Sequence, residues 1–81
     1  MDARLNITYD GQNGDLPDLV DFGASDLDVR RWVTEALRTG GIPGIARQPR
    51  ADVNGFLVDR YAATAIRPYA FIAIRPKTPF G

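Results

Sequence analysis

One segment of this chain has the periodicity of an amphipathic helix, and it divides the sequence into two halves that are rich in β-strand patterns. Ser25 can accept a hydrogen bond from an early helical N–H, and Gly40-Gly41 supplies residues that tolerate the left-handed conformation at a helix end. The spacing therefore predicts a helix over residues 26–39. Its apolar residues recur at i, i+4, i+7 and i+8 along one face: Val29, Val33, Ala36 and Leu37.

Period-two alternation of apolar and polar residues predicts two strands before this helix and two after it. The dense run Asp10-Gly11-Gln12-Asn13-Gly14 is typical of a turn between the first two strands. The most apolar strand is the last, and a strand that is apolar on both faces is usually central in its sheet. The predicted strands cover residues 3–9, 16–22, 56–61 and 70–75. Because Pro17 cannot donate to a ladder, the second of them is expected either to lie at an edge or to start after this proline.

The order β-β-α-β-β indicates an α+β fold with a mixed four-stranded sheet and one helix packed across it. A right-handed crossover after the first hairpin would place a later strand parallel to the first one. The helix would then cover the apolar face of the sheet. In a chain of 81 residues this leaves one thin core and no room for a large enclosed cavity.

The chain contains no cysteine and no histidine, which removes most kinds of active site. Disulfide frameworks, cysteine nucleophiles, zinc bound by cysteine and catalytic triads with histidine are all excluded. Ser25 is better explained as a helix cap than as a nucleophile, and Lys77 lies in a short tail. No catalytic residue, metal ligand or cofactor is expected.

The formal net charge is zero, but the two halves of the chain differ in sign. Residues 1–35 carry three arginines against eight acidic residues, a net charge of −5, and residues 36–81 carry seven cations against two acids, a net charge of +5. Nucleic-acid binding is the weaker alternative, because strong binders usually have a basic excess over the whole domain. The nine arginines against one lysine are typical of a GC-rich bacterial genome.

The run Gly41-Ile42-Pro43-Gly44 resembles the Gly-Ile-Pro turn that follows the single helix of ubiquitin. Together with the element order, it makes the chain similar to the ubiquitin-like β-grasp family. The resemblance implies one ubiquitin-like domain over residues 1–75 and a C-terminal tail over residues 76–81. It also implies an alternative function as a modifier or sulfur carrier that an activating enzyme modifies at Gly81, although Phe80 stands where those families mostly have glycine.

The first hypothesis is a protein-interaction module without enzymatic activity, which binds a protein partner through its sheet face and its tail. We expect the face opposite the helix to carry both arginine and aromatic side chains, a mixture that suits protein recognition. No apolar run approaches the roughly 20 residues that span a membrane, and no signal peptide is apparent, so a cytoplasmic location without a membrane partner is expected. The residues predicted to bind the partner are Arg60, Tyr61, Phe71 and Arg75.

Overall fold

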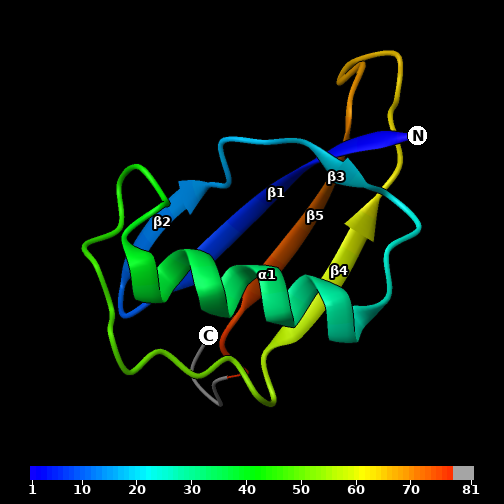
Figure 1. Ribbon diagram of the computed structural model, residues 1–81. Helices are drawn as coiled ribbons and strands as arrows, with labels where there is room; N and C mark the ends of the chain where they lie inside the picture. Colours follow the sequence, from blue (N-terminus) through cyan, green and yellow to red (C-terminus); the bar gives the residue numbers. More distant parts are fainter. Residues whose placement is uncertain (78–81) are drawn as a thin grey trace.

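The computed structural model describes residues 1–77, and in this part of the chain one helix lies across one face of a mixed β-sheet (Figure 1). The predicted α+β class with a mixed sheet and one helix is therefore confirmed. The elements in chain order are β1 (Asp2–Tyr9), β2 (Gln12–Asp15), β3 (Val20–Asp21), α1 (Asp26–Thr39), β4 (Leu57–Tyr61) and β5 (Ala70–Arg75).

The first and last strands form the centre of the sheet. β1 and β5 run parallel with Leu5 opposite Ile72, and the strand order is β2-β1-β5-β4. β2 pairs antiparallel with β1, and β4 pairs antiparallel with β5. The parallel pairing across the helix matches the predicted crossover, and it joins residues that lie 67 positions apart in the chain, such as Leu5 and Ile72.

The sheet has five strands rather than the predicted four, because the second strand is interrupted. The turn occupies only Asp10 and Gly11, whose φ angles of 51° and 73° are those of a tight two-residue hairpin. β2 then begins at Gln12, inside the predicted turn. The chain leaves the sheet after Asp15, and Pro17, which has no N–H to donate to a ladder, lies in the connection to β3. A strand over the whole of residues 16–22 is therefore not formed, and within this range only Val20–Asp21, which follows Pro17, is a strand.

The helix begins and ends at the residues that the sequence predicts. The Ser25 hydroxyl accepts a hydrogen bond from the Asp28 N–H at 3.1 Å, and Gly40 adopts the left-handed conformation with φ 75°. Val29, Val33 and Leu37 are buried against the sheet. Capping at both ends and one apolar stripe thus define α1.

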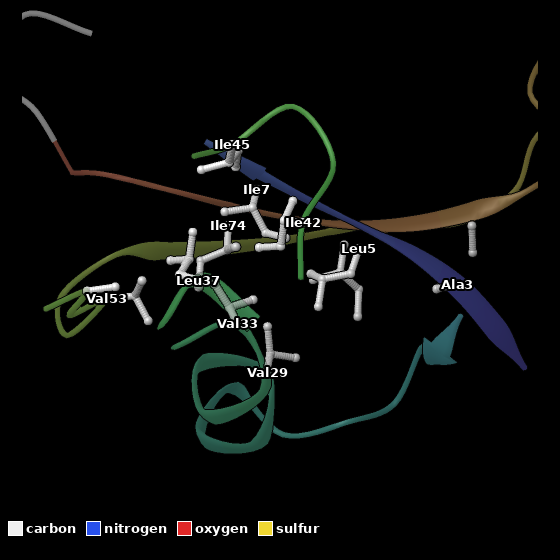
Figure 2. Packing of buried hydrophobic residues seen from close by; sticks show 13 residues of the cluster. Ala3, Leu5, Ile7, Val29, Val33, Leu37, Ile42, Ile45, Val53 and Ile74 are labelled. Carbon is white, nitrogen blue, oxygen red and sulfur yellow. The ribbon is translucent and has the colours of Figure 1, made fainter. Parts of the chain in front are cut away.

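The hydrophobic core lies between α1 and the sheet (Figure 2). Alternate residues of the two central strands point into it, including Leu5 and Ile7 of β1 and Ile72 and Ile74 of β5, each 0% exposed. The long connection after α1 closes the core at one end with apolar side chains. These residues are Ile42, Ile45, Ala51 and Val53.

Candidate functional site on the open face of the sheet

The face of the sheet opposite α1 is not covered by any other element within residues 1–77 (Figure 1). Side chains that directly face each other on neighbouring strands share a face, so the register decides which residues lie here. Arg4 of β1 is paired with Phe71 of β5, and Phe71 is paired with Tyr61 of β4. These three residues form one row across the open face, which we call the aromatic row.

The aromatic rings of this face pack against one another. Tyr61 and Phe71 stack with ring centroids 4.5 Å apart and planes inclined by 17°. Tyr69, immediately before β5, adds a tilted contact with Phe71 at 6.4 Å. The tyrosines stay partly accessible, with Tyr61 41% and Tyr69 38% exposed. The rings are therefore held in place but open to a partner.

Two arginines lie over these rings. The guanidinium carbon of Arg4 is 3.9 Å from the centroid of Tyr69, and that of Arg67 is 4.5 Å from the centroid of Phe71. Arg67 also donates from Nε to the Tyr69 carbonyl at 3.1 Å and from a terminal nitrogen to the Ala62 carbonyl. Cation–π contacts of this kind position arginine side chains without neutralising their charge.

Apart from Leu57 and Ala73, the rest of the open face is polar. Arg75 forms an ion pair with Asp59 at 3.3 Å across β5 and β4. Toward the β2 edge of the same face, Asn6 donates to the side chains of Asn13 at 3.0 Å and Asp15 at 2.8 Å. These cross-strand hydrogen bonds explain why polar residues form β2 instead of a longer turn.

The structure brings together three of the four residues predicted to bind a partner. Tyr61, Phe71 and Arg75 lie on the open face, as expected. Arg60 does not, because it faces Ile72 in the register and therefore points toward the helix. Neighbouring residues of a strand point to opposite faces, so Arg60 and Tyr61 cannot share one.

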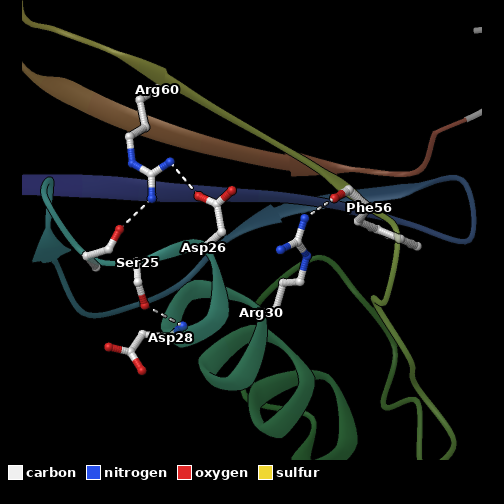
Figure 3. Close-up of polar contacts among 7 residues, drawn as sticks. Ser25, Asp26, Asp28, Arg30, Phe56 and Arg60 are labelled. Atoms are coloured by element: carbon white, nitrogen blue, oxygen red, sulfur yellow. Dashed lines mark hydrogen bonds and ion pairs between the residues drawn. The ribbon is translucent and has the colours of Figure 1, made fainter.

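Arg60 instead joins β4 to the start of the helix (Figure 3). Its guanidinium forms an ion pair with Asp26 at 2.7 Å and donates a second hydrogen bond to the Ala24 carbonyl. Arg30 of α1 makes a similar connection by donating to the Phe56 carbonyl at 2.8 Å. Both arginines tie the helix to the chain around β4.

Two residues that the sequence did not single out belong to the open-face cluster. Arg4 could have been found from the alternation, since it lies between the buried residues Ala3 and Leu5. Tyr69 precedes its strand and shows no periodic signal. Arg67 belongs to the basic second half of the chain, but its place over Phe71 depends on the loop conformation.

The other candidate features of the sequence are Ser25, the acidic residues and Gly81. The side chain of Ser25 is engaged in the helix cap, and no group of three or more acidic residues within residues 1–77 could hold a metal ion. No helix in this part of the chain is long and apolar enough to cross a membrane. Gly81, on which modifier or carrier chemistry would depend, lies outside the described residues, and the cytoplasmic location stays a prediction.

Comparison of the chain with protein-family models, with curated proteins and with solved structures found no match. The residues of the open face therefore carry the argument about function on their own.

Proposed function

We propose that this protein is a non-catalytic interaction module that binds a protein partner through the open face of its sheet. The observation that carries the proposal is the aromatic row together with the neighbouring Tyr69 and Arg67. In this cluster Arg4 and Arg67 each lie over an aromatic ring, and no element within residues 1–77 covers it. Tyrosine and arginine are enriched among the residues that dominate binding energy at protein interfaces. Rings and guanidinium groups that are already positioned lose little conformational freedom on binding.

We further infer that the fold is the β-grasp of ubiquitin-like proteins. Three features support this: an N-terminal hairpin, a single helix that crosses the sheet, and a last strand parallel to the first at the centre. The chain differs by its short strand β3, which pairs with Asp2 and Ala3 at the beginning of β1. A fold of this kind hosts many functions, so the interaction surface has to be argued from its residues.

A protein partner is favoured over a nucleic acid by the charges of the open face. Binding to a phosphate backbone requires an excess of cations. By register and alternation, this face together with its adjoining loop has four acids and three arginines. They are Asp2, Asp15, Asp21 and Asp59 against Arg4, Arg67 and Arg75.

Photo-crosslinking from the open face tests the proposal. A benzophenone amino acid replaces Tyr61, and the chain is expressed in its native host and irradiated. The matched control carries the same probe at Arg31, a 67% exposed side chain on α1. We expect a discrete protein adduct from position 61 and none from position 31.

Charge reversal on the open face provides a second, independent comparison. Arg4→Glu and Arg75→Glu change exposed residues of the face, and each should weaken the adduct from position 61. An adduct of equal yield from position 31, or one that both reversals leave intact, would contradict the proposal. An adduct that nuclease removes would assign the face to a nucleic acid instead.

A further inference from the structure

The connection between β4 and β5 is an apolar loop that the protein holds in a defined shape. Its residues Ala62, Ala63, Ala65, Ile66 and Pro68 are all exposed, and Ile66 is 97% exposed. Connecting loops normally present polar groups to water. This loop, residues 62–68, projects beyond the end of the sheet (Figure 1).

The two polar residues of the loop, Thr64 and Arg67, form hydrogen bonds that hold the loop in its conformation. The Thr64 N–H donates to the Arg67 carbonyl at 2.7 Å, and the Thr64 hydroxyl accepts from the Arg67 N–H at 2.9 Å. The Arg67 guanidinium closes the base of the loop through the Ala62 and Tyr69 carbonyls. Ile66 therefore lies in a turn that these hydrogen bonds stabilise. Its exposure to water is unfavourable in free energy, and binding would remove this apolar surface from water.

A groove with complementary properties lies on another side of the molecule. It has a volume of about 490 Å³ and runs between α1 and the chain from Leu16 to Asp21. Its charged lining residues are Asp21 and Glu35. Asp21 already forms an ion pair with the Met1 ammonium at 3.5 Å, whereas no cation within residues 1–77 forms an ion pair with Glu35. Its apolar residues include Leu19, which is 58% exposed, and Trp32, which is 36% exposed.

We propose that the loop of residues 62–68 docks into this groove on a second copy of the chain. Ile66 would insert beside Leu19 and Trp32, and the positive charge of Arg67 would lie near Glu35. The loop is apolar with one cation, and the groove is apolar with one acid, Glu35, that has no ion-pair partner within residues 1–77, so the two surfaces match in hydrophobicity and in sign of charge. A net charge of zero also leaves copies of the chain without general repulsion.

Because the loop and the groove are different patches, the contact is heterologous. Each copy that docks its loop still has a free groove, and the partner has a free loop, so further copies can add. The contact uses neither Tyr61 nor Arg4, but it shares Arg67 with the proposed partner surface, because Arg67 also stacks on Phe71. Its test measures association of the pure chain, so its failure is distinguishable from a failure of partner binding at the aromatic row.

Sedimentation velocity of the pure chain from about 10 µM to about 1 mM tests the proposal, because small interfaces associate in this range. We expect the sedimentation coefficient to rise with concentration. Ile66→Asp disables the loop and Leu19→Asp disables the groove, and each should weaken association at least about tenfold. Leu27→Asp is the matched control, because Leu27 is 65% exposed but does not line this groove.

Mixing the two disabled variants gives the decisive comparison. Ile66→Asp retains the groove and Leu19→Asp retains the loop, so an equimolar mixture should form a 1:1 dimer that does not grow further. A parent chain that stays monomeric to 1 mM, a mixture that stays monomeric, or a Leu27→Asp variant that is impaired to the same degree would overturn the proposal. The proposal would also be overturned if the monomer binds phosphatidylcholine–phosphatidylglycerol vesicles and Ile66→Asp abolishes this binding, since the loop would then be a membrane-binding segment.

Discussion

At the scale of single residues, the neighbours Arg60 and Tyr61 show that a shift of one position along a strand moves a side chain from the helix-covered face of the sheet to the open face. The side chain of Arg60 is 29% exposed and joins the edge strand β4 to Asp26 and to the Ala24 carbonyl at the helix start. Its neighbour Tyr61 points the other way and joins the aromatic row. The first residue therefore holds the helix on the sheet, while the second is available to a partner.

Arg60→Ala should lower the free energy of unfolding by about 1 to 2 kcal/mol, because it removes an ion pair and leaves the Ala24 carbonyl without its donor. Urea unfolding followed by far-UV circular dichroism measures the change. Arg31→Ala is the control, since Arg31 makes only an exposed contact with Asp28 at 3.8 Å. It should cost less than about 0.5 kcal/mol, and an equal loss in both variants would refute the assigned role of Arg60.

Gly14 allows the connection after the helix to cross directly over β2. A Cβ atom at this position would lie 2.2 Å from the Pro43 carbonyl oxygen and 3.0 Å from a methyl group of Ile42. Gly14 faces Ile7 in the register, so the crowded side is the core side. Only a residue without a side chain lets the backbone of residues 42–43 approach this closely.

Gly14→Ala should therefore destabilise the protein by about 2 kcal/mol or more, because the connection has to move away from the strand. The comparison is Gly41→Ala, where the nearest atom would be 3.6 Å from the new Cβ. That change should stay within about 0.5 kcal/mol. The two unfolding midpoints in urea measure the difference, and similar midpoints would show that the connection yields easily.

Residue-scale features were predictable where alternation alone decides them. Tyr61, Phe71 and Arg75 follow the period of two within their strands and lie on one face. Arg60 was misplaced because it was grouped with Arg75 by charge, although its position in the alternation differs. The stacking of Arg4 on Tyr69 depends on the side-by-side pairing of β1 and β5, which no local pattern reveals.

At the scale of elements, α1 was predictable because every local signal agrees. The cap, the apolar stripe and the terminal glycine all indicate the same boundaries, and the structure has them. β2 was not predictable, since its sequence Gln12-Asn13-Gly14-Asp15 has the composition of a turn. Its strand conformation is stabilised by tertiary hydrogen bonds from Asn6, which override the weak local preference.

The cap at Ser25 provides the test at this scale. Ser25→Ala removes the side-chain acceptor of the Asp28 N–H and should cost about 1 kcal/mol of unfolding free energy. Ser25→Asp restores an acceptor and should return stability to within a few tenths of a kcal/mol. Thermal unfolding of the three proteins decides between these outcomes. A Ser25→Asp variant as unstable as Ser25→Ala would mean that the hydroxyl serves a purpose other than capping.

At the scale of the whole molecule, the centre of the sheet is made by the two ends of the described chain. β1 and β5 pair along five residue positions, from Ala3 with Ala70 to Ile7 with Ile74. The order of elements and the rule of right-handed crossovers predicted that a later strand would lie parallel to the first, and the apolar character of residues 70–75 predicted a central strand there, but not that these two strands pair. The covering of the core by Ala51 and Val53 was not predictable, because residues 46–53 fold by contact with the rest of the molecule rather than by local periodicity.

Central pairing of distant segments should make unfolding cooperative, since the core cannot form on one half of the chain. Ile72 lies at this centre, fully buried, opposite Leu5 and Arg60. Ile72→Ala should reduce stability by about 3 kcal/mol. It should shift the urea midpoint of Trp32 fluorescence and that of far-UV circular dichroism by the same amount, although Trp32 lines the groove beside α1 and is not part of the core. Ile66→Ala, at a 97% exposed position, should move neither midpoint. Separate midpoints for the two probes in Ile72→Ala would show instead that the helix and the sheet lose their structure independently.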